Sequence, residues 1–177
     1  MSLRLGVEGV VARVLASDAT LAARLNGLVR ADEAVRALVG SLATSLAGVE
    51  VVLMCALFVA GRRRSAVRML TAVGLVYVVS EVLGLAWRRE RPFGELANVE
   101  ALVPHTAQRS FPSRHVASGL AMAVIGGRAQ PRLGRVMAAV AWLLGLSRVA
   151  AGLHYPSDVL AGALLGSVIG RLLRTSG

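Results

Sequence analysis

The chain has 177 residues, of which 55% are hydrophobic and only 17% are charged, and its mean hydropathy is +0.65. This composition excludes an ordinary soluble globular domain and favours a membrane protein with several spans. The net charge is +10 and every basic residue is an arginine, but the arginines are spread between apolar runs. Such spacing favours contact with anionic lipid headgroups over nucleic-acid binding.

Residues 1–30 carry apolar positions at roughly helical spacing among several charged residues. The pattern predicts one or two amphipathic helices on the membrane surface, with a break at Ser17-Asp18. We therefore divide the chain into an amphipathic N-terminal helical segment, residues 1–30, and a membrane-embedded domain, residues 31–177.

Five apolar runs follow, and they predict an all-α integral-membrane bundle. The runs cover residues 37–61, 69–87, 116–127, 136–153 and 158–170. The third and fifth are short, but they begin at polar motifs, and a site sunk below the membrane surface would shorten their apolar part. Residues 1–30 leave a sixth span open, so we expect a bundle of five to six helices. In the last run Gly162, Gly166 and Gly170 recur at four-residue spacing, which predicts close helix packing.

The distribution of arginine predicts the orientation in the membrane. Arginine clusters at 62–68, 128–135 and 171–174 fall on one side if the last four runs alternate in direction, and that side is then cytoplasmic. The loop 88–115 and the start of the last run lie on the extracytoplasmic side of what we expect to be a bacterial plasma membrane. The arginines of residues 1–36 count against this orientation, because they would also lie outside if 37–61 spans fully.

The segment from Ser147 to Asp158 places Arg148, His154 and Asp158 inside an otherwise apolar stretch. Ionisable groups there are costly and mark functional sites. An arginine fork suits phosphate oxygens, and a histidine attacks phosphorus well when a carboxylate holds its other ring nitrogen. The spacing therefore predicts phosphoryl transfer through a histidine nucleophile.

Two further polar segments are expected on the same side as this one, namely Arg88-Arg89-Glu90-Arg91-Pro92 and Ser110-Phe111-Pro112-Ser113-Arg114-His115. Together the three segments resemble the signature motifs of the type 2 phosphatidic-acid phosphatase superfamily, membrane lipid-phosphate phosphatases that share a site with vanadium haloperoxidases. The family pattern is Lys-x6-Arg-Pro, then Pro-Ser-Gly-His, then Ser-Arg-x5-His-x3-Asp. The third motif matches at every specified position, and the resemblance covers residues 84–158.

This resemblance implies a role for each matching residue. His154 would be the nucleophile that forms a phosphohistidine, Asp158 would orient it, and His115 would be the general acid. The residues implied to bind the phosphate oxygens are Arg91, Ser113 and Arg148. The resemblance also implies that no metal and no cofactor are needed, and that the partners are a lipid phosphate substrate and membrane lipids. Homo-oligomer formation is left open.

The sequence departs from the family pattern at two positions. Gly84 stands where the family has its motif lysine, and Arg88, one helical turn further on, is our candidate replacement, with Arg89 second. Arg114 stands where the family has glycine, so it either adds a phosphate contact or narrows the pocket. We interpret the nearby His105 and Arg109 as loop residues at the entrance rather than catalytic groups.

The expected function is removal of phosphate from a membrane lipid, with a polyprenyl diphosphate or a polyprenyl-phosphate sugar phosphate as the first choice of substrate. Phosphatidic acid and phosphatidylglycerol phosphate are the alternative substrates. A non-catalytic lipid-phosphate-binding protein is a second class, since Gly84 and Arg114 depart from the motifs. Vanadate-dependent peroxidase chemistry is disfavoured because the chain is small and membrane-embedded.

Overall fold

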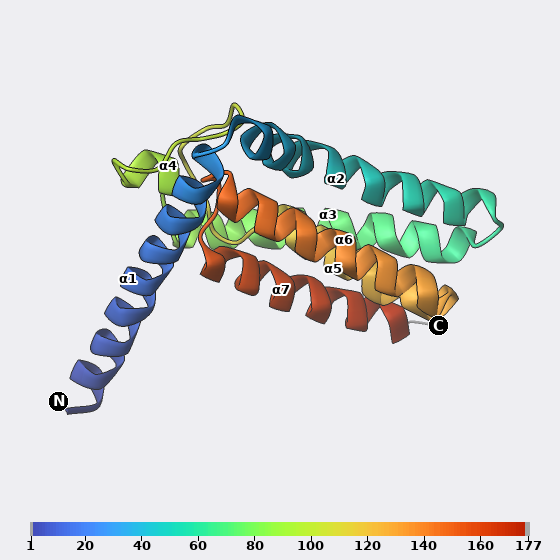
Figure 1. The fold of residues 1–177 in the computed structure, drawn as a ribbon. Helices are drawn as coiled ribbons and strands as arrows, with labels where there is room; N and C mark the ends of the chain where they lie inside the picture. The colour runs from blue at the N-terminus through green and yellow to red at the C-terminus, as the bar shows by residue number, and fades with distance from the viewer. Residues whose placement is uncertain (1, 176–177) are drawn as a thin grey trace.

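The computed structural model describes residues 2–175, and within them the chain forms seven helices and no strand. The helices are α1 (Ser2–Arg30), α2 (Glu33–Val59), α3 (Arg63–Ala86), α4 (Pro92–Glu95), α5 (Arg114–Ala129), α6 (Pro131–Ala150) and α7 (Pro156–Thr175). Helices α2, α3, α5, α6 and α7 run side by side as a bundle, and α1 leaves it at one end (Figure 1). The all-α prediction is confirmed. The helix count exceeds five to six because α4, a single turn, comes in addition to α1 and the five bundle helices.

Four of the helices within residues 2–175 are long and apolar enough to cross a membrane, namely α2, α3, α6 and α7. Large apolar side chains on these helices are exposed, including Val52, Val59, Leu70, Val78 and Leu164. The short third run corresponds to α5, in which ten of 16 residues are buried. Because its neighbours enclose it, contact with lipid does not set the length of α5.

Helices α5 and α7 approach each other closely along a row of glycines. A Cβ atom at Gly166 would lie 2.1 Å from the backbone oxygen of Ala117, and the same face of α7 carries Gly162 and Gly170, which also lie against α5. The predicted close packing is confirmed. It brings the starts of the two helices together, so that the backbone N–H of Ser113 donates to the backbone oxygen of Asp158 at 3.0 Å.

The loops that carry the three polar motifs all lie at the end of the bundle where α1 joins it (Figure 1). The α2–α3 turn, the α5–α6 turn and the end of α7 lie at the opposite end. The arginine clusters thus share one end and the motifs share the other, which is the arrangement that alternating helix directions require.

The predicted break at Ser17-Asp18 is wrong, because α1 is one continuous helix through these residues. Asp18 is buried, with 4% of its surface exposed, and its carboxylate binds Arg89 and the backbone N–H of Ser157 instead of its own backbone. Eight residues on, about two helical turns, Asn26 is fully buried and donates to the backbone oxygens of Glu100 and Ala150. Two buried polar side chains therefore fix the second half of α1 to the bundle.

The contact between α5 and α7 makes Gly166 intolerant of a side chain. Gly166→Ala should destabilise the protein by roughly 1–3 kcal/mol, because the added methyl group meets backbone that cannot move aside cheaply. Gly74→Ala is the matched control, since nothing lies within 4 Å of a Cβ there and alanine is the better helix former. Thermal unfolding in detergent measures both variants, and equal unfolding temperatures would contradict the close-packing interpretation.

Candidate active site

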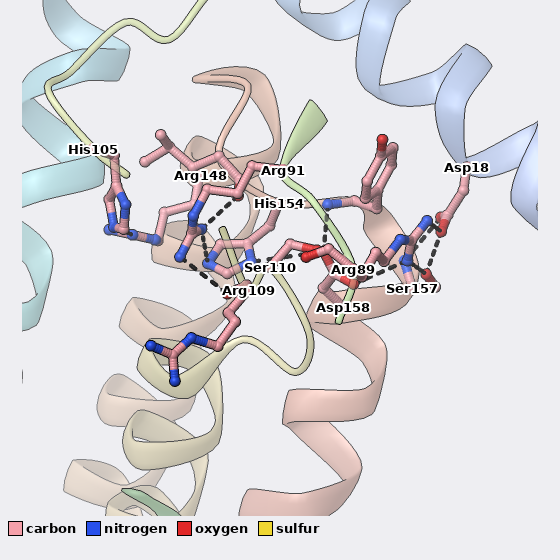
Figure 2. A network of polar contacts seen from close by, with 12 residues as sticks. Asp18, Arg89, Arg91, His105, Arg109, Ser110, Arg148, His154, Ser157 and Asp158 are labelled. Carbon is pink, nitrogen blue, oxygen red and sulfur yellow. Dashed lines mark hydrogen bonds and ion pairs between the residues drawn. The ribbon is translucent and has the colours of Figure 1, made fainter. Parts of the chain in front are cut away.

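The three polar motifs meet at one end of the bundle. Figure 2 shows Arg91 of the first motif and Arg148, His154 and Asp158 of the third in one polar network. The motif residues come from five places in the fold: the segment before α4, the start of α5, the end of α6, the loop before α7 and the first turn of α7. The five best-matched residues are each at most 4% exposed, and they are Arg91, Ser113, Arg148, His154 and Asp158. The structure thus brings together groups that the sequence separates by up to 67 positions.

His154 lies between a carboxylate and a guanidinium. Its Nδ1 is 3.7 Å from Asp158 Oδ2, and its Nε2 is 3.3 Å from Arg91 Nη1. Helix α7 begins at Pro156, between His154 and Asp158, which lets the carboxylate in the first turn reach back to the ring. Because a guanidinium only donates hydrogen bonds, Nε2 is the acceptor and the imidazole carries its proton on Nδ1.

The surroundings of His154 keep the imidazole neutral. The pKa of His154 is lowered to about 4, mainly by burial and in part by the positive charges of Arg91 and Arg148. The nearby carboxylate of Asp158 opposes this change without cancelling it. At neutral pH Nε2 therefore carries no proton, which is the state that a nucleophilic histidine requires.

Arg91 and Arg148 are held by neutral groups. Arg91 Nη1 donates to the backbone oxygen of Leu153 at 2.6 Å, and Arg148 Nη1 donates to that of Ala43 at 3.0 Å. Among residues 2–175 neither guanidinium forms an ion pair, although both are buried. Burial lowers the pKa of Arg91 to about 10, so it stays charged at neutral pH. Two buried cations without an ion-pair partner are unfavourable unless an anion joins them.

Several buried polar atoms of the motif residues lack a hydrogen-bond partner within the described part of the chain. They are Arg91 Nε, Ser113 Oγ, Arg148 Nε and His154 Nδ1. Buried polar groups are nearly always hydrogen-bonded in folded proteins. Unpaired donors beside uncompensated cations are what a site for a tetrahedral oxyanion requires.

The second motif places its two other residues differently. His115, in the first turn of α5, is half-buried and lies within the electrostatic influence of Arg148, His154 and His105. Arg114 points toward α3, where its Nη1 is 3.7 Å from Glu81 Oε2 and its guanidinium lies 5.4 Å from the centre of the Tyr77 ring. His115 therefore belongs to the cluster around His154, whereas Arg114 lies at its edge.

The position of the missing lysine is covered by another arginine. A Cβ atom on Gly84 would lie 3.2 Å from the backbone oxygen of Phe111 and 3.9 Å from Cδ of Arg109. Arg109 forms an ion pair with Glu81, one turn before Gly84 on α3. Arg88 is exposed and makes no hydrogen bond or ion pair with any residue of the described chain. No sequence periodicity marked Arg109, because it lies in a loop.

His105 also contacts the cluster, which its interpretation as an entrance residue did not anticipate. Its Nε2 lies 3.2 Å from Arg148 Nη2, and its Nδ1 lies 3.3 Å from the backbone oxygen of Thr106. These two contacts require a neutral ring that accepts from Arg148 and donates to the carbonyl. Burial and the charge of Arg91 lower the pKa of His105, which favours this neutral form.

Comparison with known proteins places the chain in a family. The model of the PAP2 superfamily matches residues 65–176, and the chain belongs to this superfamily. Over 95 residues it is 34% identical to undecaprenyl-diphosphatase BcrC of Bacillus subtilis, covering 54% of this chain and 49% of that protein. Over 90 residues it is 38% identical to decaprenylphosphoryl-5-phosphoribose phosphatase of Mycobacterium tuberculosis, covering 51% and 49%.

The fold is also that of a solved structure. The crystal structure of Aquifex aeolicus LpxE superposes with a TM-score of 0.77 at 25% identity, covering 89% of this chain and 94% of that one. The family and the apolar helices together make this chain a membrane protein. The chain spans about half the length of the two relatives described above.

The unpaired donors predict stabilisation by a tetrahedral oxyanion. Orthovanadate at 100 times its dissociation constant should stabilise the folded protein by about 2.7 kcal/mol. The thermal unfolding temperature in detergent should rise accordingly. Arg148→Gln should lose most of this stabilisation, because one of the two buried cations is removed. Arg132→Gln, an exposed arginine at the opposite end of the bundle, should keep it. Equal stabilisation of Arg148→Gln and Arg132→Gln would contradict the location of the site.

Proposed function

We propose that the protein is a membrane phosphatase that removes phosphate from a lipid phosphate or diphosphate through a phosphohistidine intermediate. The observation that carries this proposal is the neutral His154, whose Nε2 faces the guanidinium of Arg91 in a cluster with two uncompensated cations. A nucleophile aimed at an oxyanion site is the minimum that phosphoryl transfer requires.

In the first step the Nε2 lone pair of His154 forms a bond to phosphorus while the bond from phosphorus to the leaving oxygen breaks. Burial and Arg148 lower the pKa of His115 in the free protein, and the negative charge of the bound phosphate would raise it again, so that His115 enters the step protonated. His115 then gives its proton to the leaving oxygen, and Asp158 stabilises the positive charge that develops on the ring of His154. Arg91, Arg148 and Ser113 hold the equatorial oxygens, whose charge is greatest in the transition state.

In the second step water restores the enzyme. Neutral His115 takes a proton from a water molecule, the water oxygen bonds to phosphorus, and the bond from phosphorus to Nε2 of His154 breaks. Inorganic phosphate leaves and both histidines return to their starting states. No step of this scheme needs a metal or a cofactor.

The substrate we propose is a polyprenyl diphosphate or a polyprenyl-phosphate sugar phosphate, acted on at the extracytoplasmic face of a bacterial plasma membrane. The names of the two relatives support this class, since one is an undecaprenyl-diphosphatase and the other a decaprenylphosphoryl-5-phosphoribose phosphatase. The clustering of arginine at the end opposite the site supports the orientation. Phosphatidic acid and phosphatidylglycerol phosphate are the alternative substrates.

A non-catalytic lipid-phosphate binder is the alternative function, and Gly84 is the observation that favours it. Such a protein would keep the oxyanion site and lack turnover. Release of phosphate and formation of a phosphohistidine separate the two functions, because binding alone gives neither.

The nucleophile is tested with purified protein in detergent and a panel of polyprenyl and glycerol lipid phosphates. His154→Ala should reduce phosphate release to background, and His115→Ala should slow it by about 100-fold or more, as removal of a general acid does. Brief reaction with labelled substrate should leave acid-labile, base-stable phosphate on the wild type and none on His154→Ala. If wild type and His154→Ala release phosphate equally, the proposed mechanism fails.

We also propose that Arg109, rather than the predicted Arg88, supplies the cation that Gly84 lacks. Its side chain lies over Gly84, and its backbone oxygen accepts from Arg91 Nη2 at 3.3 Å. Substrate phosphate would then compete with Glu81 for the Arg109 guanidinium.

Arg109→Ala should raise KM by about tenfold, the usual cost of losing a charged hydrogen bond to substrate. Arg88→Ala should change KM by less than twofold, since that side chain is exposed and unpaired with any described residue. Initial rates over a range of substrate in mixed micelles give both values. The reverse ranking would support Arg88, and two equal small effects would mean that nothing replaces the lysine.

A further inference from the structure

Helix α1 contributes a buried carboxylate to the edge of the active site, although it lies outside the matched residues 65–176. Asp18 Oδ1 accepts from the backbone N–H of Ser157 at 2.9 Å, and its Oδ2 accepts from Arg89 Nη2 at 2.9 Å and from the hydroxyl of Ser157. Figure 2 shows Asp18 reaching this cluster from a separate helix. The contacts place an acidic side chain of α1 at the first turn of α7.

Arg89 connects Asp18 to the proposed catalytic pair. Its Nη1 donates to Asp158 Oδ1 at 2.9 Å and to the hydroxyl of Ser157 at 2.7 Å, while its Nη2 binds Asp18. The guanidinium stacks over the Tyr155 ring at 3.7 Å, which fixes its plane. The side chains of Arg89 and Asp18 are only 9% and 5% exposed, so water screens their charges little.

We propose that Asp18 is a positioning residue that sets the geometry and charge of the Asp158–His154 pair by sharing Arg89 with Asp158. This inference rests on the proposed function of His154 as the nucleophile. Arg89 stands between two carboxylates, so its positive charge is divided between them. Asp158 thereby keeps enough negative charge to hold the Nδ1 proton of His154, and the bond from Ser157 to Asp18 holds the first turn of α7 in place.

Removing the charge of Asp18 has a predictable electrostatic effect on His154. The full charge of Arg89 would then fall on Asp158, and the surroundings of His154 would gain one positive charge. The charged or titratable groups that already face His154 from the other elements are Arg91, Arg148, His115 and Asp158. None of these changes in an Asp18 variant, so a shift in the titration of His154 reports on Asp18 through Arg89.

The test compares Asp18→Asn with Asn26→Ala. Asn26 also fixes α1 to the bundle, but it bonds only to Glu100 and to the backbone oxygen of Ala150, so its loss changes no charge near His154. Asp18→Asn should lower kcat by about 10- to 100-fold, as small misplacements of catalytic groups do. KM should stay within twofold, because Asp18 touches no proposed phosphate ligand.

The pH profile separates positioning from mere docking of the helix. Neutral His154 is the reactive form, and an added positive charge disfavours its protonation. On the acidic side of the pH profile, kcat/KM falls as His154 becomes protonated. The midpoint of this acidic limb should therefore lie about one pH unit lower in Asp18→Asn. It should not move in Asn26→Ala. Equal losses of kcat in the two variants with an unmoved limb would overturn the inference.

A measurement without turnover keeps the inference independent of the proposed function. The chain has three histidines, so NMR of histidine-labelled protein can follow the His154 ring directly. Its pKa should fall in Asp18→Asn and in the smaller variant Asp18→Ser, which serves if the asparagine variant does not fold. An unchanged His154 pKa in the folded variant overturns the role of Asp18. Absence of phosphate release by the wild type, together with a shifted pKa, overturns only the phosphatase proposal.

Discussion

Two guanidinium groups, those of Arg91 and Arg148, are buried at one end of the bundle without a carboxylate partner in the described chain, and the site is organised around them. Each is held by a backbone oxygen, which fixes its direction but leaves its charge uncompensated. Burial of such charges costs several kcal/mol each by itself. A bound anion would offset this unfavourable free energy. The two buried guanidinium groups are therefore better explained by anion binding than by a contribution to the stability of the fold.

The rest of the fold serves to bring that charge and a nucleophile to the same place. The glycines of α7 let it lie against α5 at backbone contact, so that both helices start beside the cluster. Their first turns supply His115 and Asp158, and Ser113 N–H bonds directly to the Asp158 backbone. The start of α5 also favours a negative charge nearby. Tight packing in the middle of the bundle thus determines geometry at its end.

Local patterns predicted the parts of this arrangement that depend on helix spacing. His154 and Asp158 could be paired from sequence because Pro156 marks a helix start between them, and the glycines could be assigned to packing because they recur every four residues. Asp18 could not be assigned, since its partners lie 71 and 139 positions away. Its polar side chain suggested a helix break, and only tertiary contacts explain why α1 continues. The contact of Arg109 with Gly84 could not be predicted for a related reason, because a loop residue has no periodicity to indicate its direction.

The charged groups around His154 differ between the two nitrogens of its ring. On the Nδ1 side lie Asp158 and, beyond it, Asp18, and these two carboxylates share the single guanidinium of Arg89. Basic groups lie on the Nε2 side, where Arg91 is 3.3 Å from the ring. A carboxylate at Nδ1 keeps the proton there, and a guanidinium near Nε2 disfavours protonation at that atom. The field across the ring therefore favours the tautomer with its proton on Nδ1. In the proposed mechanism this is the reactive tautomer, and the protein would not need to reorganise when phosphorus is attacked. Because α1 supplies part of this field, the N-terminal helix is an electrostatic component of the site as well as a neighbour of the bundle.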